Sequence, residues 1–248
     1  MKVVFNPNLN LFSDIEKAGF HLIGGNKTTA IVEWPPGSQV KAIKTSLNYL
    51  TDTDIERTEF RPKDLPGEYF SQGKCALFGP KYHYSFVVYL KDWEQDTYPE
   101  IVAQWHGKPD PGEDIGMGPP LSLRIIDGIW FVYTKAIAVP ESKINPKTKR
   151  YDFIRNGGTG VGEVKDDINK FVQWNFFVQW GWGQSGRLRV TKNNLIVIDE
   201  KGPNCYNDLA GPIFRLGIYK WDWRKGRFDG PVKERTAYYR GIKISAAV

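Results

Sequence analysis

Hydrophobic and polar residues alternate along most of this chain, in short runs separated by glycine, proline and asparagine. Alternation with a period of two is typical of strands that bury one face. The runs that fit strands are Thr28–Trp34, Ala42–Tyr49, Ile55–Arg61, Ser85–Leu90, Ile101–His106, Leu121–Ile126, Gly128–Thr134, Lys170–Val178, Arg187–Val190, Leu195–Asp199, Ile213–Lys220 and Tyr238–Ile244. Asp127-Gly128 and Asn193-Asn194 each separate two runs and predict tight hairpin turns.

Many short strands with almost no helical period predict an all-β fold, an antiparallel sandwich or jelly roll. We expect one helical turn, at Leu11–Gly19, with Ser13 as its N-cap and Gly19 as its stop. The chain shows no internal repeat or linker, so residues 1–248 are expected to form a single domain. The glycine-rich Asn156–Gly162 is expected to be a surface loop. It lacks the Lys-Ser/Thr pair of a phosphate-binding loop, so nucleotide binding is not expected.

Composition adds a polyanion to the possible partners. The 248 residues are 41% hydrophobic and 25% charged, enough for a full core. Aromatic residues reach 14%, and such rings fill sandwich cores or form platforms for sugars. The net charge of +6 favours a negatively charged polymer without naming it.

The two cysteines, Cys75 and Cys205, could pair or remain buried thiols, and their spacing does not decide. No His/Cys pattern indicates zinc. No apolar run approaches the roughly 20 residues of a membrane span. The apolar run at the N-terminus is too short for a signal peptide. Either the protein does not use that export route or its signal has been removed.

The first run with candidate chemistry is Glu100–Gly107. On a strand Gln104 and His106 share one face, and Trp105 faces the core. A lone histidine in this setting is usually a buried structural residue, so the run alone does not identify a site.

A second candidate is Glu56–Arg61, where Arg57, Glu59 and Arg61 share a strand face. Such a row can be an exposed, self-neutralising edge of little energetic value. It can also be a device in which Glu59 fixes an arginine that binds a substrate carboxylate.

The third candidate is Gly211–Trp223, where Arg215, Gly217 and Tyr219 share a face. A glycine within a strand often marks the close approach of a ligand or another backbone. A tyrosine beside a cation loses its proton more readily. The structural alternative is a core tyrosine beside an extended arginine.

Together the three runs supply Arg, Gln, His and Tyr, which is the set needed for β-elimination at O4 of a uronic acid. The C5 proton becomes acidic only when the neighbouring carboxylate is neutralised. A base then removes that proton, and an acid protonates the leaving oxygen. No metal is needed in the chemical step.

In sequence order the three runs resemble the signature strands of jelly-roll polysaccharide lyases. In the alginate-lyase branch these strands have the patterns R-[ST]-E-x-R, Q-[IV]-H and Y-x-K-x-G-x-Y. The longer segments resemble the glucuronan lyase and heparin lyase I-like group more closely. They are Gln104–Asp110, Pro119–Leu123, Gly202–Asp208, Gly211–Trp221 and Tyr82–Phe86 with Asp92-Trp93.

The resemblance implies a concanavalin-like β-jelly-roll sandwich, and it implies roles for individual residues. Gln104 and Arg57 or Arg61 would neutralise the carboxylate, and His106 would be the base or a second neutralising group. Tyr219 would be the acid, or both base and acid. Arg215 stands where the family usually has lysine, which keeps the charge but changes the donor geometry. Further substrate contacts are expected at Arg61, Arg215, Tyr82, Tyr84 and Lys220.

The substrate decides how the proton moves. In glucuronate the C5 proton and O4 leave from one ring face, so Tyr219 could serve both. In iduronate they lie on opposite faces, and His106 becomes the natural base. The resemblance favours β-1,4-glucuronan, with a heparin- or alginate-type lyase as the alternative. Ile213, where the alginate-lyase pattern has tyrosine, argues against alginate.

Two other functions are compatible with a β-sandwich of this composition. A retaining glycoside hydrolase needs two carboxylates about 5 Å apart, and the E-x-D-x-x-E pattern of hydrolases on this fold is absent. Asp52–Glu56 offers acids on one face but is more typical of a turn. A non-catalytic carbohydrate-binding module would keep the aromatic and basic residues without needing the Gln/His/Tyr set.

The same family implies no cofactor in the chemistry but a structural calcium ion. Asn207 and Asp208, just before the third run, offer oxygen ligands suited to a hard cation, and the alternative is an Asn-Asp turn. We expect a monomer that binds an anionic polysaccharide, with neither nucleic acid nor membrane as partner. This substrate class suggests an extracellular or periplasmic enzyme.

Overall fold

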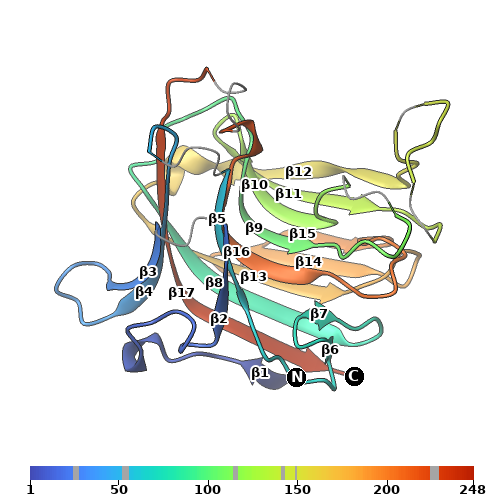
Figure 1. The fold of residues 1–248 in the computed structure, drawn as a ribbon, viewed down its shortest axis with the longest axis horizontal. Helices are drawn as coiled ribbons and strands as arrows, with labels where there is room; N and C mark the ends of the chain where they lie inside the picture. The colour runs from blue at the N-terminus through green and yellow to red at the C-terminus, as the bar shows by residue number, and fades with distance from the viewer. Residues whose placement is uncertain (25–27, 52–55, 114–116, 141–142, 149, 224–228) are drawn as a thin grey trace.

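The computed structural model describes residues 1–24, 28–51, 56–113, 117–140, 143–148, 150–223 and 229–248. In this part of the chain the strands form two antiparallel sheets packed face to face (Figure 1). The predicted antiparallel sandwich is confirmed. Both chain termini lie at the same edge, because β1 (Lys2–Phe5) pairs with the end of β17 (Glu234–Ala247).

One sheet has eight described strands in the order β15-β14-β13-β8-β17-β4-β3, with β1 beside β17. Its other strands are β3 (Thr29–Glu33), β4 (Lys41–Asn48), β8 (Lys81–Lys91), β13 (Phe171–Gln179), β14 (Arg187–Lys192) and β15 (Leu195–Lys201). Alternate residues of the central strand β8 are buried against the other sheet, as the period of two requires.

The second sheet has nine described strands in the order β12-β11-β10-β9-β16-β5-β2, with β7 beside β16 and β6 beside β7. They are β2 (Phe20–Gly24), β5 (Arg57–Pro62), β6 (Phe70–Ser71), β7 (Cys75–Ala76), β9 (Glu100–His106), β10 (Leu121–Ile126), β11 (Ile129–Ala136), β12 (Arg155–Glu163) and β16 (Ile213–Tyr219). Short 3₁₀ turns lie at Leu9–Leu11, Val164–Asp166 and Trp221–Trp223.

Aromatic rings fill the space between the two sheets. Trp105 of β9 is fully buried, and its ring centroid lies 4.5 Å from that of Phe176 and 5.0 Å from that of Phe214. Large rings of this kind supply much of the apolar area buried in a core. The prediction that Trp105 faces the core is confirmed.

Both predicted hairpin turns are confirmed by their backbone angles. Asp127 and Gly128 have φ of 48° and 74°, and Asn193 and Asn194 have 49° and 68°. Positive φ at both central positions is what a type I′ hairpin requires.

The helical turn expected at Leu11–Gly19 is found in part: the Ala18 amide donates to the Asp14 carbonyl at 3.1 Å, and Gly19 follows with a φ of 90°. The expected N-cap was wrong, because Asp14, not Ser13, accepts from the Lys17 amide. The surface loop expected at Asn156–Gly162 was also wrong, because this segment lies in strand β12, at the edge of the nine-stranded sheet. Glycine has low β-propensity, but β11 supplies a full pairing partner for this segment.

Sequence patterns also missed four short strands, β1, β2, β6 and β7, which are too brief to show alternation. Ile55, at the start of one predicted run, lies outside the described residues. Cys75 and Cys205 are buried free thiols. Among the described residues, no helix is long and apolar enough to cross a membrane.

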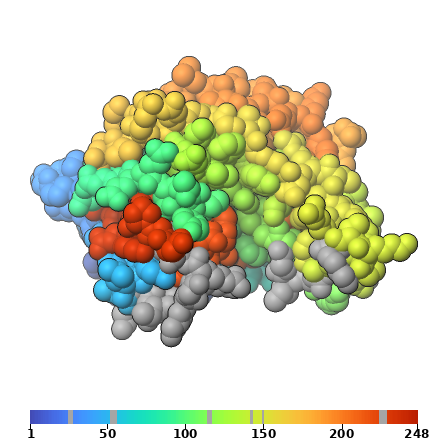
Figure 2. All heavy atoms as spheres, turned by 90° about the horizontal axis from the view of Figure 1, so that it is seen from above, coloured from blue at the N-terminus to red at the C-terminus, as the bar shows by residue number. Residues whose placement is uncertain are grey.

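Loops from distant parts of the sequence meet at one end of the molecule. The Tyr49 amide donates to the Lys233 carbonyl at 2.8 Å, and the Tyr98 hydroxyl bonds to Asp229. Seen from above, the segments around these residues lie side by side (Figure 2). This end adjoins the C-terminal ends of strands β16 and β4 and the start of β17.

Candidate active site

The three candidate runs become neighbouring strands at the centre of the nine-stranded sheet, in the order β9-β16-β5. Tyr219 of β16 pairs with Arg57 of β5, and Arg215 of β16 pairs with Gln104 of β9. Residues paired across antiparallel strands point to the same face. Segments far apart in sequence therefore place their candidate side chains together, on the face turned away from the core.

Glu59 is the centre of this group. Its side chain is 1% exposed, and Oε1 accepts a hydrogen bond from Nε2 of Gln104. Its Oε2 lies 3.8 Å from a terminal nitrogen of Arg57 and 3.9 Å from one of Arg215. Burial raises the pKa of Glu59, whereas Arg215, the Gln104 bond and Arg57 lower it. Glu59 thus holds an amide and two guanidinium groups around one carboxylate.

Gly217 allows strands β16 and β5 to lie close together. A Cβ built there would lie 2.2 Å from the Thr58 carbonyl oxygen, and the residue has a φ of +131°. Any larger side chain would collide with β5. Of the two roles expected for this glycine, close approach of a backbone is the one that the geometry supports.

Arg57 and Tyr219 form a stacked pair. The guanidinium carbon of Arg57 lies 4.0 Å from the centroid of the Tyr219 ring, and Arg57 also donates to Glu56 at 3.0 Å. A cation over a ring face fixes the ring and stabilises negative charge developing on it. Arg61 lies further along β5, where its side chain bonds to the Pro62 carbonyl.

His106 is held as a neutral imidazole. Its Nδ1 lies 2.6 Å from the Gly107 carbonyl oxygen, an acceptor only, so Nδ1 carries the proton and Nε2 keeps its lone pair. Burial, then the nearby Arg215 and Arg57, lower the pKa of His106 to about 4. A neutral imidazole adds no positive charge, so this geometry favours the role of base over that of charge neutraliser.

Next to His106 lies a cluster of three carboxylates, Asp110, Glu113 and Asp208, each with an oxygen within 4.8 Å of the others. Asp208 is buried, and its Oδ1 has no hydrogen-bond partner among the described residues. Burial, Glu113 and Asp110 raise the pKa of Asp208 to about 8. An orphaned oxygen among three acids fits a hard cation such as Ca²⁺.

Asn207, the other expected calcium ligand, donates through its amide nitrogen to the Ala138 carbonyl at 2.7 Å. Its part in calcium binding stays a prediction. Sequence reasoning missed Asp110 and Glu113, whose only signal was their position shortly after the Gln104–His106 strand.

Two of the expected substrate contacts were also wrong. Tyr82 and Tyr84 lie on β8 of the opposite sheet and are buried. The Tyr82 hydroxyl donates to the Tyr69 carbonyl at 2.7 Å, and the Tyr84 ring lies 5.3 Å from that of Trp105. Their inward direction follows from strand alternation, which puts both rings in the core.

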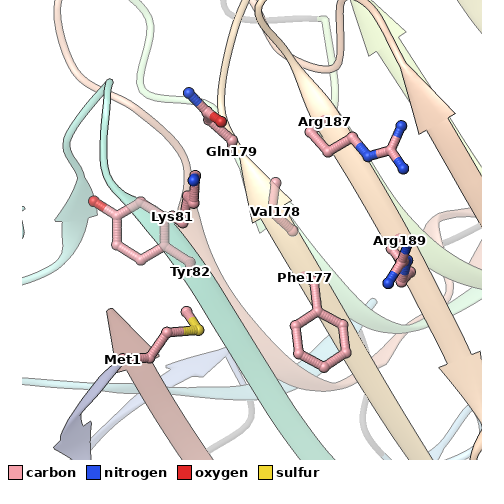
Figure 3. A pocket seen from close by; sticks show the side chains of 8 residues that line it. All are labelled: Met1, Lys81, Tyr82, Phe177, Val178, Gln179, Arg187 and Arg189. Atoms are coloured by element: carbon pink, nitrogen blue, oxygen red, sulfur yellow. The ribbon is translucent and has the colours of Figure 1, made fainter. Parts of the chain in front are cut away.

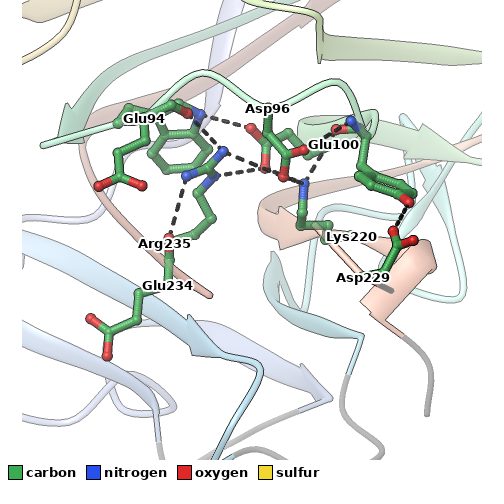
Figure 4. Close-up of polar contacts among 9 residues, drawn as sticks. Glu94, Asp96, Glu100, Lys220, Asp229, Glu234 and Arg235 are labelled. Carbon is green, nitrogen blue, oxygen red and sulfur yellow. Dashed lines mark hydrogen bonds and ion pairs between the residues drawn. The ribbon is translucent and has the colours of Figure 1, made fainter. Parts of the chain in front are cut away.

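Lys220 is a third correction, because its side chain is fully buried. Its Nζ lies 2.8 Å from Asp96 and 3.3 Å from Glu100, and Arg235 donates to Glu100 at 2.9 Å (Figure 4). Lys220 directly follows Tyr219 but points the opposite way. It belongs to a structural ion cluster and not to the outer face.

A separate hollow lies on the outer face of the eight-stranded sheet (Figure 3). Phe177 lies on its floor, and Arg187 and Arg189, on one wall, both pair with Asp199. None of its described lining residues comes from the three motif strands. We therefore place the candidate active site on the nine-stranded sheet.

Comparison with solved structures supports the same fold. Endo-β-1,4-glucuronan lyase from the fungus Trichoderma reesei has a TM-score of 0.70 at 15% identity, over 91% of this chain and 90% of that one. An alginate lyase from Aplysia kurodai has a TM-score of 0.57 at 13% identity, over all of both chains. The binding domain of botulinum neurotoxin DC has a TM-score of 0.51 at 10% identity, over 98% of this chain and 47% of that one.

Such low identities establish the fold alone, since one fold hosts unrelated functions. No curated protein sequence gives a significant match to the chain. The family model described as polysaccharide lyase, however, matches residues 15–243. The chain therefore belongs to the polysaccharide lyase family and is a lyase enzyme with a jelly-roll fold.

Proposed function

We propose that this lyase cleaves a polymer of uronic acid, and that β-1,4-glucuronan is its substrate. The observation that carries the proposal is the convergence of Arg57, Arg215 and Gln104 around one buried carboxylate, with Tyr219 and His106 beside the arginines. The face holds three arginines against Glu56 and Glu59, which leaves a positive charge for an anionic substrate. The likeness to a solved endo-β-1,4-glucuronan lyase adds support for this polymer.

In this mechanism Arg215 and the Gln104 amide bind the uronate carboxylate. Their positive charge and hydrogen bonds stabilise the negative charge that develops when C5 loses its proton. The electron pair of the C5–H bond forms the C4–C5 double bond, and the C4–O4 bond breaks. The departing O4 receives a proton, so the products are an unsaturated uronate and a new chain end with a free hydroxyl.

For glucuronate, Tyr219 moves both protons. Its oxygen, acting as phenolate, takes the C5 proton and returns it to O4 on the same ring face. The Arg57 guanidinium, 4.0 Å from the ring centroid, stabilises that phenolate. His106 then orients the substrate as a neutral hydrogen-bonding group.

A heparin-type substrate is the second candidate, and the protonation of His106 favours it. Nε2 of His106 is an unprotonated base at neutral pH. With iduronate, whose C5 proton and O4 lie on opposite faces, His106 would remove the proton and Tyr219 would protonate O4. An alginate-type substrate is the other alternative, because the guluronate units of alginate also carry the C5 proton and O4 on opposite ring faces.

The same proposal includes a structural calcium ion at Asp110, Glu113 and Asp208. When bound, Ca²⁺ would neutralise the acids and take no part in the proton transfers. Asp208 and His106 flank one small pocket with Gly107, the residue whose carbonyl fixes the His106 tautomer. The ion would thus hold the loop that orients His106.

We further expect one lyase domain over residues 1–248, a monomer and a location outside the cytoplasm, where polyuronates occur. Because the C4–C5 double bond absorbs ultraviolet light, mixing the protein with glucuronan, heparin, hyaluronan or alginate tests the central proposal. Absorbance should rise fastest with glucuronan. No rise with any polyuronate would rule out uronate elimination, and a rise with heparin alone would favour the second candidate.

A further inference from the structure

Tyr219 has an arginine on each side within one row of the nine-stranded sheet. It pairs with Arg57 of β5 on one side and with Ile101 of β9 on the other, and Ile101 pairs in turn with Arg124 of β10. With about 4.8 Å between adjacent strands, the Arg124 backbone lies about 10 Å from that of Tyr219. The sequence motifs include Arg57 but not Arg124.

Arg124 lies on the outer face, stacked between aromatic rings. Its guanidinium carbon lies 4.1 Å from the ring centroid of Tyr133 and 5.8 Å from that of Trp221. Its Nε donates to the Ser122 hydroxyl at 2.8 Å. Within the described part of the chain it forms no ion pair, and burial is the main cause that lowers its pKa. Its terminal nitrogens are therefore free to bind a planar carboxylate.

The glycine-rich strand β12 fixes the ring under this arginine. Gly158 pairs with Tyr133, and a Cβ at Gly158 would lie 2.6 Å from the Tyr133 ring. The Tyr133 hydroxyl donates to Asn156 at 3.0 Å. Gly157, its neighbour, has no atom within 4 Å of an added Cβ. The missing side chain at Gly158 thus makes room for the ring that supports Arg124.

We infer that Arg124, supported by Tyr133 and Trp221, binds the carboxylate of the uronate next to the one that is cleaved. This inference rests on the proposed function. Successive sugar rings of a β-1,4 chain are rotated by about half a turn, so their carboxylates lie on opposite edges of the chain. Arg215 lies in the sheet row of Gln104 and Ser122, whereas Arg124 lies in the row of Tyr219. The two cations thus suit a substrate with uronates at consecutive positions.

Binding to inactive protein tests this assignment. In a Tyr219→Phe background, adding Arg124→Gln should weaken calorimetric binding of a glucuronan tetrasaccharide about tenfold or more, since hydrogen bonds between charged groups are strong. A hyaluronan tetrasaccharide, in which uncharged sugars separate the uronates, should lose less than about twofold. Arg240→Gln is the matched control, because Arg240 also stacks on a ring, that of Phe171, but lies on the other sheet.

A second pair of variants tests the support of Arg124. Gly158→Ala should displace Tyr133 and weaken tetrasaccharide binding, whereas Gly157→Ala should not. Equal affinity of the Arg124→Gln variant and its parent for the glucuronan tetrasaccharide would overturn the inference, and so would an equal loss for hyaluronan. If wild-type protein yields no unsaturated product, the proposed function fails. In that case, a loss of affinity for the glucuronan tetrasaccharide without a loss for the hyaluronan tetrasaccharide would still support carboxylate binding by Arg124.

Discussion

Two charged clusters flank the end of strand β16, one on each side of the sheet. The structural cluster of Lys220, Arg235, Asp96 and Glu100 has two cations and two anions, with side chains at most 1% exposed. The outer cluster around Glu59 has ion-pair distances of 3.8 and 3.9 Å and more arginines than acids. Tyr219 and Lys220 are adjacent in sequence yet belong to different clusters.

The difference separates a cluster that stabilises the fold from one that can receive a ligand. In the structural cluster each charge has a partner at short range, and removing one leaves another buried and unpaired. In the outer cluster the described contacts leave Gln104 Oε1, Glu59 Oε2 and Arg215 Nε without hydrogen bonds. Of these atoms, Arg215 Nε can donate to a substrate carboxylate. In the structural cluster Asp96 Oδ2 also lacks a hydrogen bond, but it already lies 2.8 Å from Lys220 Nζ.

The largest expected effect comes from breaking the structural cluster. Lys220→Met would leave Asp96 and Glu100 with only Arg235, and should lower the free energy of unfolding by about 3–5 kcal/mol. Urea denaturation measures this loss. Lys170→Met, which removes an exposed lysine, should change stability by less than about 0.5 kcal/mol. Comparable stability of the two variants would show that Lys220 is not part of a structural cluster.

The next effect concerns His106 and pH. The folded state keeps the pKa of His106 near 4, below its ordinary value of 6.5. The unfolded chain therefore takes up the proton first as pH falls. Stability from this residue is fully present above pH 6.5 and decreases towards pH 4, by about 3 kcal/mol in all. The difference in the free energy of unfolding between wild type and His106→Asn, measured across this pH range, gives the contribution of His106. A difference that does not change with pH would contradict the prediction.

A third expected effect concerns Glu59, the carboxylate at the centre of the outer cluster. Glu59→Gln keeps the shape of the side chain but releases Arg57 and Arg215, so turnover should fall about a hundredfold through misplaced carboxylate binding. Stability should change by less than about 1 kcal/mol, because the buried charge is costly in the folded state. Steady-state kinetics and denaturation together check this. A large loss of stability with normal turnover would reverse the assignment.

The smallest expected effect is that of calcium. At about ten times its Kd, Ca²⁺ should add about 1.4 kcal/mol of stability. The gain should be larger above pH 8, where protons no longer compete for Asp208, whose pKa is about 8. Thermal unfolding with Ca²⁺ or a chelator measures it, and Asp208→Asn should abolish it. An unchanged Ca²⁺ response in that variant would place the ion elsewhere.

Much of the fold follows from local pattern. Alternation and type I′ turn residues located most long strands, and they also put Trp105 in the core. The same alternation, applied to Lys220 and Tyr84, already points both side chains inward, whereas family resemblance alone made them substrate contacts. Strand β12 escaped detection because glycine has neither a side chain to alternate nor a β-propensity.

The parts of the site that escaped prediction depend on tertiary packing. Asp110 and Glu113 meet Asp208 through tertiary contacts, among them the hydrogen bond from the Leu209 amide to Asp110 at 2.9 Å, and no spacing rule encodes these contacts. Arg124 becomes part of the outer face only through its register with β9. Gln104 and Tyr219, by contrast, were predictable because their motifs are short, ordered along the chain and placed on strands.

The most direct test compares Tyr219→Phe with Lys220→Met, two substitutions at adjacent positions. With glucuronan, Tyr219→Phe should give no rise in ultraviolet absorbance while unfolding at nearly the wild-type urea concentration. Lys220→Met should unfold at a much lower urea concentration, and its folded fraction should still produce the C4–C5 double bond. Full turnover by Tyr219→Phe would contradict the account.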